Sequence, residues 1–169
     1  AWMARSATLR LVDSGEVLAD YLSVPCSLSM YSAATPKEGI RAQVVPLDMN
    51  DLRGKLVLTS APAKDAVPRA LKGGAVGIIS DYMPMYPGAR DLREEMRGVS
   101  RWENDFILPL NDTGLFAFNL APEKGDLLRE AMTKGEVFLE ANVETEAHDG
   151  VLPTVSACIP GSDQHAGEV

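Results

Sequence analysis

Histidine and cysteine are scarce in this sequence, with two of each among 169 residues. A catalytic metal site needs three or four His, Cys, Asp or Glu ligands, and a serine or cysteine nucleophile needs a histidine beside it. His148 and His165 both lie in polar stretches, where a solvated loop position is the simpler interpretation. We therefore expect no catalytic residue, no metal and no cofactor in this chain.

Positive charge and long apolar runs are also lacking. Lys and Arg number 16 against 24 Asp and Glu, which gives a net charge of −8. This balance argues against nucleic acid or an anionic membrane surface as the main partner. No apolar run approaches the ~20 residues of a membrane span, and the first residues contain no signal core. These features do not determine the cellular compartment.

The two cysteines, Cys26 and Cys158, lie far apart and form no Cys-x-x-Cys pair. Two buried thiols are favoured over a disulfide, and the pairing stays open.

Short helices alternate with a larger number of strands in the predicted order of elements. We expect helices at 15–22, 61–74, 91–98 and 122–135, and strands at 40–47, 55–60, 75–80, 106–110, 115–120, 136–146 and 154–159. In the second helix, Asp65 is the expected N-cap and Pro68 falls in the first turn. In the strand 136–146, Val137, Leu139 and Ala141 alternate and should face inward. This order favours a mixed α+β domain over a doubly wound parallel sheet.

Three glycines in "ALKGGAVGIISDY" raise the question of a phosphate-binding loop. Such a loop needs a strand, then glycines, then a helix whose N-terminus faces the anion. Here a helix precedes the glycines and a strand follows, so the helix would present its carbonyl end. We interpret Gly73, Gly74 and Gly77 as structural, together with Gly54 in the preceding "DLRGK" turn.

The stretches "DLRGKLVLTS", "ALKGGAVGIISDY" and "FAFNLAPEKGDLLREAMTKGEVFLEANVE" together resemble the protease-associated domain. That family has a D-x-x-G-K turn before a strand, a helix leading into a G-A-x-G-x-I strand, and a later helix followed by a long alternating strand. The resemblance implies a β-sandwich or an open, barrel-like mixed sheet with short flanking helices, of the swivelling β/β/α type.

The tail "TVSACIPGSDQHAGEV" is similar to the point where the peptidase domain resumes after such an insert in family twenty-eight zinc aminopeptidases. The resemblance implies three segments: residues 1–39 as a lead-in from the peptidase, 40–147 as the protease-associated domain, and 148–169 as a linker and returning strand. It also implies zinc in a separate catalytic domain, that domain as partner, contact with peptide substrate, and a family that is often extracytoplasmic.

A long irregular loop, residues 81–102, is the expected contact surface. By resemblance it would face substrate or the peptidase domain; a loop folded over its own small cluster is the open alternative. The candidate contact residues are Tyr82, Met83, Met85, Tyr86, Arg90 and Trp102. The predicted function is a non-catalytic accessory domain of a zinc aminopeptidase. The alternative is a stand-alone module that binds peptides or small molecules.

Overall fold

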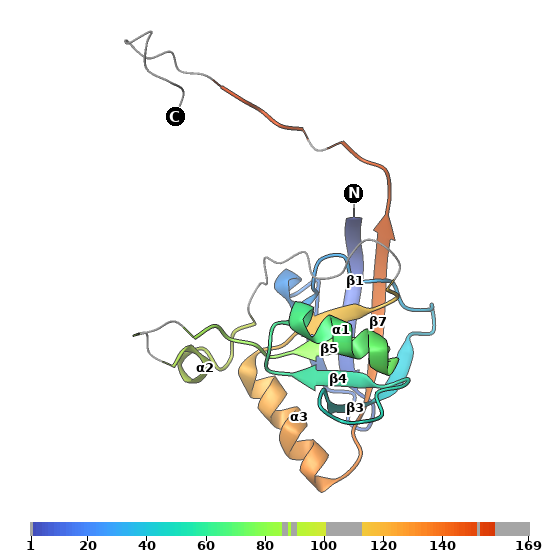
Figure 1. Cartoon of the computed structure of the whole chain (residues 1–169), viewed down its shortest axis with the longest axis vertical. Helices are drawn as coiled ribbons and strands as arrows, with labels where there is room; N and C mark the ends of the chain where they lie inside the picture. The colour runs from blue at the N-terminus through green and yellow to red at the C-terminus, as the bar shows by residue number, and fades with distance from the viewer. Residues whose placement is uncertain (1, 86–87, 89–90, 101–112, 152, 158–169) are drawn as a thin grey trace.

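A seven-stranded mixed sheet organises the chain (Figure 1). The structure, a computed structural model, describes residues 2–85, 88, 91–100, 113–151 and 153–157. The strands are β1 (Trp2–Leu11), β2 (Val17–Asp20), β3 (Ile40–Pro46), β4 (Leu56–Thr59), β5 (Gly77–Ser80), β6 (Phe116–Asn119) and β7 (Phe138–Ala147). The helices are α1 (Ala63–Gly73), α2 (Leu92–Glu95), α3 (Pro122–Lys134) and the short 3-10 helix η1 (Pro25–Ser27).

The sheet has an antiparallel half and a parallel half. Its order is β2-β1-β7-β3-β4-β5-β6; β3 to β6 are parallel to one another, and β7 pairs antiparallel with both β1 and β3. Residues 25–33 lie between the two outer strands: the Ser29 amide donates to the Ala117 carbonyl of β6 at 2.9 Å, and η1 contacts β2. The sheet is thereby nearly closed into a barrel, which confirms the predicted mixed α+β class.

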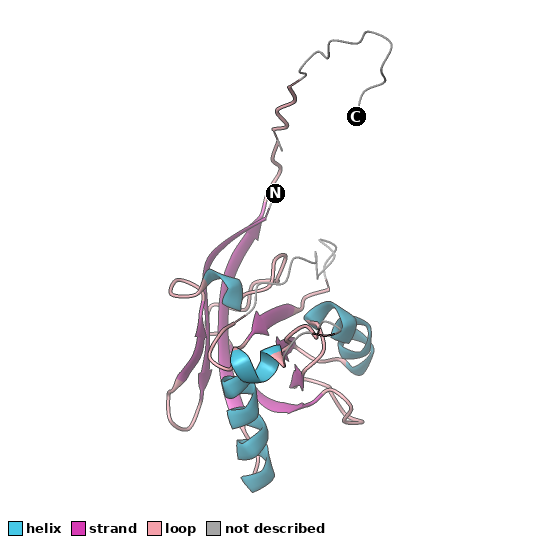
Figure 2. Cartoon of the chain, turned by 90° about the vertical axis from the view of Figure 1, so that its left-hand side faces the viewer, coloured by secondary structure: helices cyan, strands magenta, loops and turns pink. Residues whose placement is uncertain are grey.

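Two apolar clusters cover opposite faces of the parallel half because successive side chains of a strand point to opposite sides. Leu56, Ile79 and Phe116 belong to the cluster inside the barrel, with Leu128 of α3. Val57, Ile78 and Ala117 belong to the other cluster, beneath the buried face of α1. Figure 2 shows α1 and α3 against the sheet, with the long β1 and β7 side by side.

The predicted helix at 15–22 is wrong, because Val17–Asp20 is β2, paired antiparallel with β1. The apolar residues there fit either period, and a tight turn decides between them: Gly15 has φ of 72°, and the Leu11 amide bonds to the Glu16 carbonyl at 2.9 Å. The strands β1 and β2 lie within residues 1–39 and belong to the same sheet as residues 40–147.

Helix α1 differs from its prediction at the start and agrees at the end. It begins at Ala63 with Pro62 as N-cap, so Asp65 is not the cap and Pro68 lies in the helix interior. The proline removes one backbone hydrogen bond, and the burial of one apolar side of α1 stabilises the helix by more than this loss. At the other end, Gly74 takes the left-handed conformation with φ of 73° and ψ of 28°, as predicted.

Most of the other predicted helices and strands agree with the structure. The strands β3, β4, β5, β6 and β7 and the helix α3 are confirmed, and α2 is shorter than predicted. Residues 154–157, the described part of the predicted strand 154–159, form no strand, and Val155 is 94% exposed. The predicted strand 106–110 lies outside the described residues. Within the described part of the chain, no helix is long and apolar enough to cross a membrane.

Candidate functional site

Polar residues gather where the four parallel strands end. Because β3 to β6 run the same way, their carboxyl ends meet at one edge of the sheet. Asp48 follows β3, Ser60 follows β4, Asp81 follows β5, and Asn119 is the last residue of β6. In parallel sheets this edge is where ligands usually bind, so it is the first place to look for a site.

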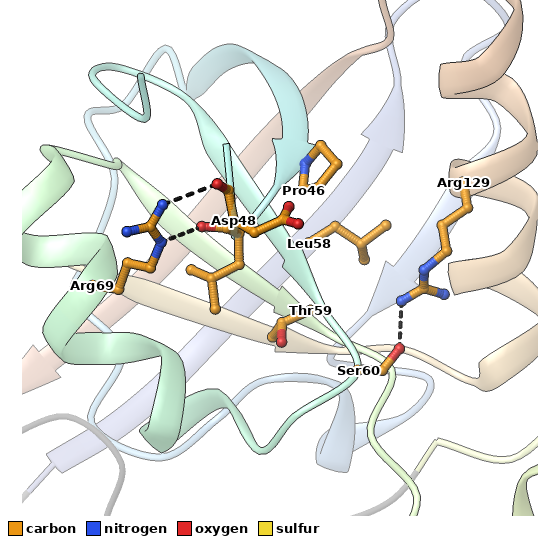
Figure 3. Close-up of a pocket in the computed structure, with 8 residues that line it drawn as sticks. Pro46, Asp48, Leu58, Thr59, Ser60, Arg69 and Arg129 are labelled. Atoms are coloured by element: carbon orange, nitrogen blue, oxygen red, sulfur yellow. Dashed lines mark hydrogen bonds between the residues drawn. The ribbon is translucent and has the colours of Figure 1, made fainter. Parts of the chain in front are cut away.

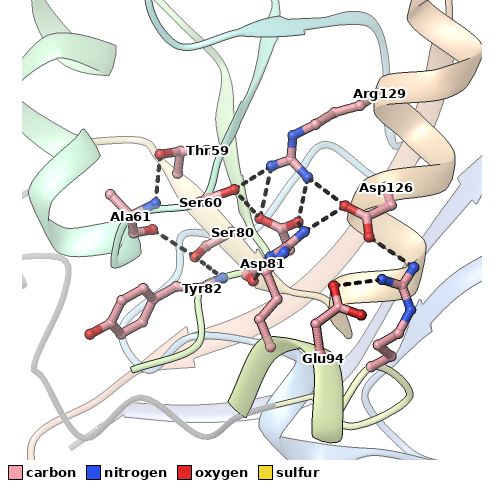
Figure 4. A network of polar contacts seen from close by, with 11 residues as sticks. Thr59, Ser60, Ala61, Ser80, Asp81, Tyr82, Glu94, Asp126 and Arg129 are labelled. Atoms are coloured by element: carbon pink, nitrogen blue, oxygen red, sulfur yellow. Dashed lines mark hydrogen bonds and ion pairs between the residues drawn. The ribbon is translucent and has the colours of Figure 1, made fainter. Parts of the chain in front are cut away.

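Asp81 is the buried centre of an ion-pair network at this edge (Figure 4). Its side chain is 0% exposed. The guanidinium of Arg129 donates to both carboxylate oxygens, at 2.5 and 2.9 Å. Arg93 donates to Oδ2 at 2.7 Å, and the Ser60 hydroxyl donates to Oδ1 at 2.9 Å. Four donors from three elements therefore satisfy one carboxylate.

A second carboxylate, Asp126 on α3, extends the network outward. It accepts hydrogen bonds from Arg93 at 2.6 Å and from Arg97 at 3.0 Å. The backbone carbonyl of Arg97 in turn accepts from the amide of Glu123 at 3.0 Å. These contacts fasten α2 and the residues after it to the first turns of α3. Part of the loop predicted as a contact surface is therefore anchored to its own domain.

The pKa of Asp81 reflects two opposing effects. Burial disfavours the charged form and raises the pKa, but the hydrogen bonds from Arg129 and Arg93 outweigh it and hold the pKa below its ordinary value. Asp81 is thus ionised in the folded protein, and together with Asp126 it balances the charges of the two guanidiniums.

Acidification should weaken the fold through Asp81. A carboxyl whose pKa is lower when folded gives stability above its unfolded pKa, and this stability is lost as the pH falls through the folded value. We expect the urea midpoint of unfolding to fall below about pH 4. In Asp81→Asn this acid-side fall should be shallower, while the variant is less stable at neutral pH. Parallel pH profiles for both proteins would contradict the assignment to Asp81.

The network is suited to structure and not to acid–base catalysis. A general acid or base must exchange a proton with a substrate, and both oxygens of Asp81 are occupied by fixed donors. Among the described residues, no group of three or more His, Cys, Asp or Glu side chains is placed to hold a metal ion. The described histidine, His148, is exposed on the segment after β7. We derive no zinc-dependent step from these residues.

The candidate contact residues have different surroundings. Met83 is buried at 8% exposure, Tyr82 is half-buried, and Met85 is 83% exposed. Tyr86, Arg90 and Trp102 lie outside the described residues. The contact role of this set stays a prediction.

The four glycines singled out from the sequence disfavour a side chain for two reasons, backbone conformation at Gly54 and Gly74 and crowding at Gly73 and Gly77. Gly54 and Gly74 have positive φ, and the amide of Gly54 donates to the Gly74 carbonyl at 2.8 Å. A Cβ on Gly73 would lie 2.8 Å from Cδ1 of Leu52, and one on Gly77 would lie 2.6 Å from Cε2 of Phe116. The order helix, glycines, strand is as predicted, so α1 turns its carbonyl end toward this joint.

The part of the edge beside β3 and β4 is open. A shallow groove of about 360 Å³ lies there between α1 and α3 (Figure 3). Its lining residues are Pro46, Leu47, Asp48, Leu58, Thr59, Ser60, Arg69 and Arg129. The groove was not predicted from the sequence, because it depends on the parallel pairing of β3 with β4, which no local pattern indicates.

Cys26 is half-buried, and its thiol donates to the Ser100 carbonyl at 3.4 Å. Cys158 lies outside the described residues, so the pairing of the two stays open.

No family model matches this chain, and no curated protein does. Solved structures do match over most of it. A peptidase M28 precursor from Shewanella amazonensis SB2B superposes with a TM-score of 0.51 at 16% identity, over 86% of this chain and 36% of that protein. An aminopeptidase from Aneurinibacillus sp. strain AM-1 gives a TM-score of 0.53 at 17% identity, over 86% and 33%.

A third match is BSAP, a zinc aminopeptidase from Bacillus subtilis, with a TM-score of 0.52 at 16% identity, over 85% of this chain and 32% of that protein. This chain therefore spans about a third of the length of the peptidases it matches. At these identities the likeness is one of fold. The chain has the fold of a part of these peptidases.

Proposed function

We propose that this chain is a non-catalytic accessory domain, of the protease-associated type, of a zinc aminopeptidase. The observation that carries the proposal is the partial match: 86% of the chain superposes on about a third of a peptidase M28 precursor. The motifs "DLRGK" and "GGAVGIIS" support it independently, since they form the β4 entry turn and the α1–β5 joint. The ion-pair network around Asp81 adds support, because its charged groups bond to one another and hold the fold together.

The role that we assign to the domain is to form a wall beside a catalytic site. Arg93 and Arg97 anchor the α2 segment to Asp126 of α3, so this segment is held in place by its own domain. Met85 precedes it and is 83% exposed, which leaves an apolar side chain for a neighbouring domain or a peptide substrate. An anchored helix and an exposed apolar side chain before it in the sequence suit the shaping of substrate access.

Activity of the isolated chain and of its parent polypeptide tests the proposal. We expect residues 1–169 alone to hydrolyse no aminoacyl p-nitroanilide, with or without added zinc. The coding sequence around them should encode a His-x-Asp motif after an apolar strand, and the whole polypeptide should release p-nitroaniline in a zinc-dependent way. Turnover by the isolated chain, or flanking sequence without peptidase motifs, would refute the proposal.

Hydrogen exchange tests the wall role separately. We expect the amides around Met85 to gain protection in the whole polypeptide relative to the isolated chain. The amides of α2 should be protected in both, because their anchor is internal. Equal exchange around Met85 in both proteins would remove the contact role and leave the accessory-domain assignment intact.

A second candidate function is a stand-alone binding module. The open groove at the ends of β3 and β4 is the observation that favours it. In that case the flanking sequence would lack a peptidase domain, and the groove would hold the ligand.

A further inference from the structure

The groove at the ends of β3 and β4 is bordered by a turn that one arginine holds in place. Arg69 of α1 donates from Nε to the Leu47 carbonyl at 2.6 Å. Its Nη2 donates to the carbonyls of Asp48 and Met49, each at 3.0 Å. One guanidinium thus binds three consecutive carbonyls of the turn after β3. The backbone that carries the Asp48 side chain is therefore fixed before any ligand arrives.

These three hydrogen bonds from Arg69 leave the Asp48 carboxylate on the groove side of the turn. In Figure 3 this carboxylate extends away from Arg69, toward Pro46 and Leu58. It accepts no hydrogen bond and joins no ion pair with any residue that the structure describes, and it is exposed. Only the backbone carbonyl of Asp48 is used by Arg69.

Arg129 is the other charged side chain that faces the groove, and it is already paired with carboxylates. Arg129 gives hydrogen bonds to Asp81, Asp126 and Ser60. The guanidinium of Arg69 lies on the far side of the turn and is engaged with carbonyl oxygens. The charge that faces the groove without a partner is therefore negative, and the chain as a whole carries −8.

The floor of the groove is apolar. Leu58 is buried at 4% exposure, and Pro46 stands beside it at the end of β3. A carboxylate at the border of an aliphatic floor is complementary to a cation on a short carbon chain: the charge meets the carboxylate while the methylenes cover the floor.

We propose that this groove is a binding site for an alkylammonium group, with the ammonium on the Asp48 carboxylate and the adjoining carbon chain over Leu58 and Pro46. Arg69 acts as a positioning residue through the turn. Two sources carry this chemistry in peptides, a lysine side chain and a free N-terminus. This binding site follows from the groove's own residues, whether or not the chain is part of a peptidase.

NMR titration of the ¹⁵N-labelled chain tests the proposal with three small probes. Nα-acetyl-lysinamide presents a lysine side chain, leucinamide presents a free α-ammonium, and Nα-acetyl-leucinamide is the uncharged control. We expect at least one charged probe to shift the amides of Asp48, Thr59 and Ser60 with saturation in about the millimolar range, weakening with salt. The uncharged probe should shift none of them.

Two variants of equal net charge make the test specific. Asp48→Asn should weaken the binding by about two- to fivefold, as expected for loss of an exposed ion pair. Asp65→Asn removes the same charge from an exposed position on α1 outside the groove and should leave the affinity unchanged. Saturation by the acetyl-lysinamide alone assigns the site to lysine side chains, and saturation by leucinamide alone assigns it to N-termini. Saturation by neither, or equal weakening in both variants, would overturn the proposal.

Discussion

Asp81→Ala is expected to lower the free energy of unfolding by about 3–5 kcal/mol, which is a large part of the stability of a typical domain. The carboxylate is fully buried and accepts from Arg129, Arg93 and Ser60. Without it, the two guanidiniums lie beside a cavity and lose the buried one of the two carboxylates that they share, while Asp126 remains. This loss, and not the energy of any one contact, makes the expected effect large.

Urea unfolding followed by circular dichroism would measure the effect. The matched control is Asp126→Ala, which removes a carboxylate of the same network whose side chain is 37% exposed. Solvent screens that position, so the control should cost about 1 kcal/mol or less. Equal costs for the two variants would show that burial of Asp81 does not set the energetics of the network.

Hydrogen exchange in Asp81→Asn gives a second readout if the alanine variant fails to fold. Because Arg93 connects α2 to Asp81 and Asp126, weakening that link should raise exchange in residues 92–97 more than in β7. Uniform acceleration over the chain would point instead to global loss of stability alone.

The antiparallel strand β7 illustrates what local pattern predicts well. Leu139 and Ala141 of β7, and Val137 just before it, stand at every second position, and all three are buried at 7% exposure or less. The α1–β5 joint was also predictable, since the left-handed stop at Gly74 follows from glycine chemistry. Both features depend on residues that are neighbours in the sequence.

The buried site was not predictable in the same way. In the sequence, Asp81 looks like the first residue of an exposed loop. Its partners Arg93 and Arg129 lie 12 and 48 residues away along the chain. Whether an aspartate there is buried depends on which helices pack over the strand ends. The error at β2 has a similar cause, because its apolar residues fit either period and the turn at Gly15 that pairs it with β1 decides between helix and strand.

Gly77→Val should destabilise the fold more than a substitution at Gly74. A Cβ on Gly77 would lie 2.6 Å from Cε2 of Phe116 and 2.9 Å from Cδ2 of Leu56. Both neighbours are buried, at 1% and 0% exposure, so neither can move without disturbing the barrel interior. We expect a cost of about 3 kcal/mol, at the upper end of the range for overpacking, with Gly77→Ala also destabilising.

Gly74→Ala is the comparison that separates crowding from backbone strain. Gly74 has φ of 73°, but a Cβ there would meet no atom closer than 3.6 Å. Its cost should therefore come from the left-handed conformation alone, about 1 kcal/mol. Thermal unfolding of the three variants would rank them. If Gly77→Val kept the wild-type midpoint, close packing of β5 against β4 and β6 would not be the reason for a glycine at this position.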